Sequence, residues 1–218
     1  MAYVCRLVVL PIAVGLLTLW VVRLFFLSDG RVEARLVTLD ISRAQLDGSV
    51  GAKSALVILS DLRCAKCQTF ASQVLPKIRK EYIEPGLLRL AFLYTATRAD
   101  AAAKNQALVE CLGEQRLFWK AYPHLFSIPT AAEASTDAFD LVEPFDRRVL
   151  SSCVSARRSE EPIDIGRLLP QGGTDLPAFL VGPINKSLVV EARGAIGGGA
   201  PLEVFIQTFT ALGIGARP

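Results

Sequence analysis

Two cysteines three positions apart, Cys64 and Cys67, are the residues of this sequence best suited to chemistry. The apolar run at residues 55–59 predicts a buried strand before them, and apolar side chains at helical spacing follow from Phe70. The pair therefore lies where a strand gives way to a helix, whose N-terminal N–H groups and dipole stabilise a thiolate over a thiol. Lys66 places a cation between the two sulfurs. We predict an exposed, acidic Cys64 and a resolving Cys67 one turn inside the helix.

A zinc site and a purely structural disulfide are the alternative interpretations of this pair. Tetrahedral zinc needs two further ligands, and the candidates are His124 and the scattered Cys111 and Cys153. A disulfide that closes so short a loop removes little chain entropy and stabilises little. We therefore expect redox chemistry at the pair, without a metal or another cofactor.

Composition limits the partners that the chain can have. A length of 218 residues allows one domain with an appendage. The formal net charge of +3 is modest, and no basic stripe with interleaved aromatic residues is present. We expect a monomer with no nucleic-acid partner.

The N-terminal residues 1–27 predict a membrane-spanning helix. Residues 7–22 carry no charge, and the apolar run resumes after Arg23. A helix over residues 7–27 would be roughly 31 Å long, about the thickness of a hydrocarbon core. A cleaved signal peptide is the alternative, but no A-x-A-like cleavage site follows the apolar run. We predict an uncleaved signal anchor, followed by a tether and a first strand at residues 28–53.

The charges around this anchor and the cysteine chemistry favour opposite orientations. The positive-inside rule counts Arg6 on the short side against Arg23, Arg31 and Arg35 on the long side, which favours a cytoplasmic domain. Disulfide chemistry is typical of oxidising compartments, which favours export. We predict the exported orientation.

The segments around the cysteine pair predict an α/β fold. A second strand at residues 87–94 follows the helix, and a strand–helix–strand unit of this length gives a parallel pair. The pattern then turns helical over residues 99–169. A hairpin at residues 178–191, a flexible loop at residues 194–199 and an amphipathic helix at residues 201–212 complete the chain. The order is a βαβ half, a helical insertion and a ββα half.

Shorter segments before the cysteine pair give weaker patterns. Residues 36–40 alternate and predict an edge strand, and residues 45–54 are turn-rich. Pro76 lies inside the helix that follows the cysteines and predicts a kink there.

Four stretches resemble the DsbA-like branch of the thioredoxin fold, the bacterial exported thiol–disulfide oxidoreductases. They are the strand, aspartate and CxxC motif at residues 58–67, the proline-containing helix at 74–79, the insert at 110–126 and the loop at 173–182. The resemblance covers about residues 46–212 and implies a thioredoxin-like domain at residues 54–214. It implies a single-pass protein of the bacterial inner membrane whose periplasmic domain exchanges disulfides with cysteine-containing protein substrates, with room for a membrane redox partner.

The resemblance also implies roles for residues outside the CxxC motif. Pro177 would follow a cis peptide bond, and the Leu176 backbone beside Cys64 would pair with a substrate strand. Some DsbA-like proteins carry an extra bridge in the insert, which implies a structural disulfide between Cys111 and Cys153. Two buried thiols that pack as small hydrophobic groups are the alternative.

The sequence departs from the family pattern at three places. The family usually has proline, glycine, histidine or an aromatic residue inside the motif, where this chain has Ala65 and Lys66. Ile58 takes the place of a buried acid that helps to accept the proton of the resolving thiol, and Leu176 replaces a threonine or valine. A non-enzymatic binding protein or metallochaperone with the thioredoxin fold, using the cysteines as ligands, is the alternative function.

Overall fold

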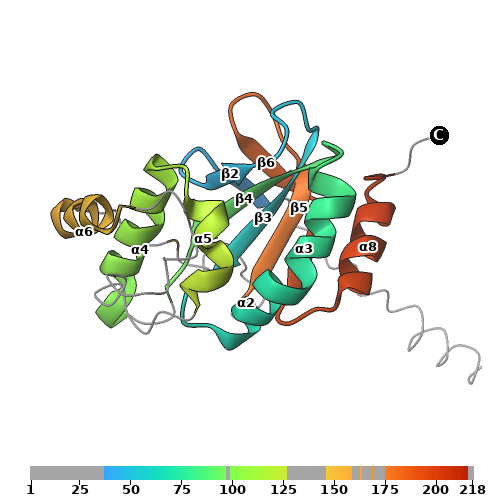
Figure 1. Ribbon diagram of the computed structural model, residues 1–218. Helices are drawn as coiled ribbons and strands as arrows, with labels where there is room; N and C mark the ends of the chain where they lie inside the picture. The colour runs from blue at the N-terminus through green and yellow to red at the C-terminus, as the bar shows by residue number, and fades with distance from the viewer. Residues whose placement is uncertain are drawn as a thin grey trace, which may run out of the picture. The chain divides into compact units, whose positions relative to one another are not determined.

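The computed structural model describes residues 37–96, 99–126, 146–158, 163, 168 and 175–215 (Figure 1). The anchor expected at residues 1–27 lies outside this part of the chain, as do residues 127–145 and most of residues 159–174, which include much of the helical insertion expected at residues 99–169. Among the described helices, none has the length and apolar character needed to cross a membrane. The α/β thioredoxin-like fold with a helical insertion is confirmed for the described residues.

The strand that precedes the cysteine pair lies at the centre of a five-stranded sheet. In spatial order the sheet contains β2 (Gln45–Asp47), β4 (Leu88–Tyr94), β3 (Ser54–Ser60), β5 (Ala178–Pro183) and β7 (Gly194–Gly197). Strand β3 runs parallel to β4 and antiparallel to β5. Every residue of β3 after Ser54 is buried, as a continuous apolar run requires when both faces of a strand are covered. The predicted parallel pair is confirmed.

The strands after β5 differ from the sequence prediction. The turn of the predicted hairpin is present, with an isolated antiparallel bridge between Ile184 and Val190. The strand β6 (Val189–Ala192), however, pairs along its length with β1 (Val37–Asp40) in a separate two-stranded sheet. On the side away from β3, the neighbour of β5 is β7, which occupies residues predicted to be a flexible loop. Gly182 allows the crossing, because a Cβ there would lie 1.9 Å from the Glu191 carbonyl oxygen. The turn-rich segment before β3 likewise contains a strand, β2, paired antiparallel with β4.

The helix after the cysteine pair alternates between α-helical and π-helical turns. Its segments are α2 (Ala65–Thr69), η1 (Phe70–Val74), α3 (Leu75–Ile78) and η2 (Arg79–Ile83). Just before Pro76, the Leu75 N–H donates to the Phe70 carbonyl five residues back. A wider turn is a known way to fit a proline, which has no N–H and crowds the preceding turn. The structure thus has a π-helical turn just before Pro76, and the kink predicted there stays a prediction.

The remaining helices add buried side chains to the same core as α2 and α3. They are α4 (Ala99–Glu114), α5 (Phe118–Leu125), α6 (Arg147–Ala156) and α8 (Leu202–Ala211). Of these, α6 packs against α4 rather than on the sheet. Leu56 and Ile58 of β3 face the helix-side core, whereas Ala55, Val57 and Leu59 face the β1–β6 side. This alternation follows from the two-residue period of a strand.

Aromatic contacts fix the helix that carries the cysteines against the sheet. The Phe70 ring lies 4.5 Å from that of Phe179 on β5 and 5.6 Å from that of Phe205 on α8, measured between ring centroids. All three side chains are buried. Burial of such rings contributes about 1.5–3 kcal/mol each, so the start of α2 is held firmly above the ends of β3 and β5.

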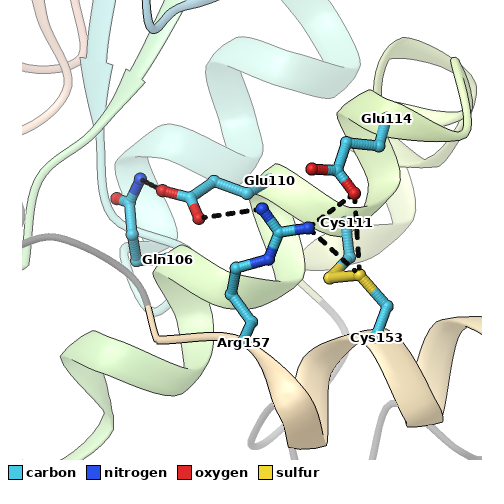
Figure 2. Close-up of polar contacts among 6 residues, drawn as sticks. All are labelled: Gln106, Glu110, Cys111, Glu114, Cys153 and Arg157. Carbon is cyan, nitrogen blue, oxygen red and sulfur yellow. Dashed lines mark hydrogen bonds and ion pairs between the residues drawn. A yellow bond between two sulfur atoms is a disulfide. The ribbon is translucent and has the colours of Figure 1, made fainter.

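A disulfide and an ion pair join α6 to α4 at the far end of the insertion (Figure 2). Cys111 of α4 is bonded to Cys153 of α6. Arg157, just after α6, donates from Nη2 to Glu114 Oε2 at 2.5 Å, and its Nη1 lies 3.9 Å from Glu110 Oε2. The hydrogen bond to Glu114 raises the pKa of Arg157, so the guanidinium stays charged. The two helices are therefore held by a covalent link with an ionic one beside it.

Removal of the Cys111–Cys153 bridge should destabilise the protein without altering the CxxC pair. The bridge spans a sequence separation of 42 residues, for which the chain-entropy model gives about 4 kcal/mol as an upper figure. We expect Cys111→Ala/Cys153→Ala to lower the free energy of unfolding by about 2–4 kcal/mol, measured by urea denaturation of the full-length chain. Cys5→Ala, the control, removes a thiol outside both bridges. A loss equal to that of the control would contradict a stabilising bridge.

Candidate functional site

Cys64 and Cys67 form a disulfide at the start of α2. Cys64 is the N-cap residue with extended backbone angles (φ −103°, ψ 113°), and its Sγ accepts a hydrogen bond from the Cys67 N–H at 3.1 Å. The Cys64 side chain is half-buried, whereas Cys67 is fully buried. An incoming thiolate can therefore approach the Cys64 sulfur more readily than the Cys67 sulfur.

A turn built on Asp61 aims Cys64 at the helix start. The Asp61 side chain is buried, and its Oδ1 accepts a hydrogen bond from the Arg63 N–H at 3.0 Å. The Cys64 N–H donates to the Asp61 carbonyl oxygen at 3.3 Å. Aspartate favours such a turn because its short side chain bonds the backbone two residues on. The turn redirects the chain from β3 into α2 within four residues.

The loop before β5 brings Leu176 beside Cys64. The Leu176–Pro177 peptide bond is cis, and both residues are buried. The Leu176 carbonyl oxygen lies 3.5 Å from Cys64 Sγ, across a sequence separation of 112 residues. The antiparallel pairing of Leu59 with Ala178 accounts for this approach, because it places the end of β3 next to the start of β5.

Lys66 forms an ion pair that sequence reasoning missed. Its Nζ lies 3.5 Å from Oδ2 of Asp175, with relative side-chain exposures of 57% and 77%. Asp175 directly precedes Leu176, so the pair links α2 to the loop that carries the cis peptide bond. The signal in the sequence was the position of an acid next to this loop, but nothing local indicated Lys66 as its partner.

The helix-facing side of β3 carries no carboxylate at the position that is often acidic in the DsbA-like branch. Ile58 occupies it and is fully buried. The next residue on the same face, Ser60, is also buried, and so is Tyr122 of α5. The Ser60 and Tyr122 hydroxyls make no hydrogen bond of regular geometry in the described structure, although Ser60 lies close enough to Tyr122 to offset part of the rise in the Tyr122 pKa. Burial raises the pKa of Tyr122, which keeps its hydroxyl protonated. Hydroxyls, rather than a carboxylate, are the polar groups that this face offers.

Comparison with solved structures shows the same fold in bacterial proteins. DsbA of Chlamydia trachomatis aligns with a TM-score of 0.61 at 14% identity, over 77% of this chain and 90% of that one. Oxidised BdbD of Bacillus subtilis aligns with a TM-score of 0.58 at 17% identity, over 81% of this chain and 97% of that one. Alpha-DsbA1 of Wolbachia pipientis aligns with a TM-score of 0.53 at 20% identity, over 80% of this chain and 92% of that one. At these identities the likeness is one of fold, and it confirms the resemblance to the DsbA-like branch.

Comparison at the level of sequence gives one family. No curated protein matches the chain. The family model described as thioredoxin matches residues 44–164, which include the CxxC motif, the parallel β3–β4 pair and helices α4 to α6. This match covers more than half of the 218 residues. The chain therefore belongs to the thioredoxin family, with a DsbA-like fold and a Cys64–Cys67 pair at the start of α2.

Proposed function

We propose that this protein is a thiol–disulfide oxidoreductase that exchanges disulfides with cysteine-containing proteins through Cys64 and Cys67. The observation that carries the proposal is the hydrogen bond from the Cys67 N–H to the half-buried Cys64 sulfur at the start of α2. This backbone donor and the helix dipole stabilise negative charge on Cys64 after reduction. A stabilised, accessible thiolate beside a buried partner suits reversible disulfide exchange.

In the oxidising direction, a substrate thiolate attacks Cys64 Sγ. The bond between Cys64 and Cys67 breaks, a mixed disulfide forms, and Cys67 leaves as a thiolate that takes up a proton. A second substrate thiolate then attacks the substrate sulfur of the mixed disulfide, and Cys64 leaves as a thiolate. The substrate loses two electrons and the cysteine pair gains them. Reversal of these steps reduces a substrate disulfide, and the reduction potential decides which direction prevails.

Leu176 and Pro177 would hold the substrate strand. The Leu176 carbonyl oxygen lies 3.5 Å from Cys64 Sγ, so a strand paired with the backbone there would pass directly over the reactive sulfur. Strand addition of this kind obtains affinity from main-chain hydrogen bonds and therefore tolerates varied substrates. Because Ile58 replaces the buried acid, proton exchange at Cys67 would be slower than in family members with a carboxylate there.

The apolar N-terminal segment supports a membrane-anchored, exported location for this activity. Residues 7–27 of this segment are long enough, as a helix, to span a membrane once. An oxidising compartment outside the cytoplasm would also preserve the Cys111–Cys153 bridge. We place the thioredoxin-like domain in the periplasm of a bacterial cell, tethered to the inner membrane, where a membrane redox partner could restore the cysteine pair.

Reduced Cys64 should have a pKa below the ordinary thiol value of about 8.5. The backbone donor and the helix dipole favour the thiolate, so alkylation by iodoacetamide should remain fast at pH values well under 8. Following the rate at the Cys64 peptide by mass spectrometry gives the pKa directly. Lys66→Glu should raise it by replacing a cation with an anion. An ordinary pKa in the wild-type chain would contradict the activated-thiol mechanism.

Cys67→Ser should trap mixed disulfides between Cys64 and substrate proteins. Without the resolving thiol the covalent intermediate cannot collapse into the internal disulfide, so it accumulates. Mass spectrometry of non-reducing gel bands identifies the trapped proteins. Cys64→Ser/Cys67→Ser is the matched control and should trap none. An equally empty result for Cys67→Ser alone would favour a binding protein or metallochaperone over an oxidoreductase.

A phosphatase that is active only after export should be active when fused behind Pro218, and the fusion should remain in the membrane fraction. Both outcomes follow from an uncleaved anchor with the domain outside the cytoplasm. A fusion to a reporter that is active only in the cytoplasm is the control and should be inactive. Activity of that control instead would support the orientation indicated by the arginine count. A shortened chain in the soluble fraction would show that the N-terminal segment is cleaved.

A further inference from the structure

We propose that Asp175 is a positioning residue that holds the Lys66 ammonium and thereby weakens its effect on Cys64. The inference rests on the proposed function and deepens it, because it assigns control of Cys64 reactivity to a pair of charges rather than to one lysine. Asp175 was not among the residues that the sequence indicated. It lies beside Lys66 only because β5, which follows it, pairs with β3, which precedes the cysteines.

The Lys66 side chain lies between two segments that are distant in sequence. Its Nζ is 3.5 Å from Asp175 Oδ2, on the loop that leads to Leu176. Its stem passes the loop between β7 and α8, where a Cβ built on Gly199 would lie 3.9 Å from Lys66 Cγ. This is an ordinary van der Waals distance, so the stem runs alongside this loop without needing the glycine. The ion pair with Asp175 is thus the interaction that holds the ammonium.

The other charged groups close to Cys64 along the chain are already engaged. Among the described residues on α2 and its flanking loops, these are Arg63 and Asp61. The Asp61 carboxylate accepts the Arg63 N–H at 3.0 Å, and both residues take part in further interactions. The sequence of the β7–α8 loop, residues 198–201, contains no charged residue. Lys66 and Asp175 are therefore the exposed pair of opposite charges that faces the start of α2.

A carboxylate close to Lys66 acts on the Cys64 thiolate in two ways. It holds the ammonium beside itself, which weakens the attraction of the ammonium for the thiolate, and its own negative charge repels the thiolate. Both effects raise the thiol pKa relative to a site with Lys66 alone. Because the two side chains are mostly exposed, solvent and salt screen the effect strongly. The pair then makes the reduced form less stable, and the protein less oxidising, than the isolated lysine would.

The test is the pKa of Cys64 in the reduced full-length chain, from alkylation rates at the Cys64 peptide at low ionic strength. Asp175→Asn keeps the shape of the side chain and removes the charge, and it should lower the pKa by about 0.2–0.7 unit. Lys66→Gln should raise it. In the Lys66→Gln background, Asp175→Asn should shift the pKa by less than half as much, because the ammonium that Asp175 restrains is gone. In 1 M NaCl the shift should shrink further.

Glu84→Gln is the matched control, because it removes an exposed carboxylate beyond the far end of the same helical run. It should leave the Cys64 pKa unchanged. The proposal is overturned if Asp175→Asn leaves the pKa unchanged or raises it. It is also overturned if the shift is equally large without Lys66, since direct repulsion by Asp175 would then account for the whole shift.

Failure of this inference can be told apart from failure of the proposed function. If Cys67→Ser traps substrate proteins while Asp175→Asn has no effect on the pKa, only the role of Asp175 is wrong. If the wild-type thiol has an ordinary pKa of about 8.5 and no substrate is trapped, the oxidoreductase proposal fails whatever Asp175→Asn does. A structural role for Asp175 would alter unfolding in urea without the salt-dependent pKa shift.

Discussion

The hydrogen bond from the Cys67 N–H to Cys64 Sγ requires that a strand end and a helix begin within a few residues. Three features of the fold meet this requirement. The Asp61 turn redirects the chain, the Phe70 ring fixes α2 against the sheet, and the burial of Cys67 leaves Cys64 as the more accessible sulfur. The sulfur at an N-cap replaces the side-chain oxygen that usually satisfies these N–H groups. The hydrogen bond that caps the helix is therefore also the one that would stabilise negative charge on Cys64.

The pairing of β3 with β5 brings the second half of the site to the first. Leu59 lies opposite Ala178, which leaves the residues just beyond each strand at the same edge of the sheet. The Leu176 carbonyl and the Asp175 carboxylate reach the two ends of the Cys64–Ala65–Lys66 segment in this way. One loop thus contributes a backbone acceptor near the sulfur and a charge near the lysine. A change in that loop would affect strand binding and thiol acidity together.

The two disulfides differ in what they can contribute. The Cys64–Cys67 bond closes a loop of sequence separation 3, so it constrains the unfolded chain little. The Cys111–Cys153 bond spans 42 residues, and its Cys111 end is fully buried between helices. The first bond therefore suits repeated opening, whereas the second suits the stability of the insertion. Arg157 beside the second bond gives α6 an ionic contact to α4 that does not depend on the oxidation state of the cysteines.

Local patterns determined the segments that carry the reactive cysteines. Four local features were each sufficient to predict an element. They are the apolar run of β3, the helical spacing from Phe70, the apolar run of β4 and the proline before α8. The reason is that burial on both faces or on one helical stripe leaves a periodic trace in consecutive residues. The CxxC motif at the strand–helix junction could be located for the same reason.

The tertiary structure decided the edges of the sheet and the charges of the site. Strand β2 has three residues, too few to show an alternation, and two of the four residues of β7 are glycines. Strand β6 pairs along its length with β1 and meets the chain just after β5 at an isolated bridge, near the place where Gly182 lets the two backbones approach closely. Lys66 meets Asp175 for a similar reason. Their contact depends on the pairing of β3 with β5, which brings Cys64 beside Leu176 although 112 residues separate them in sequence. Pairing between such distant segments leaves no signal within either segment.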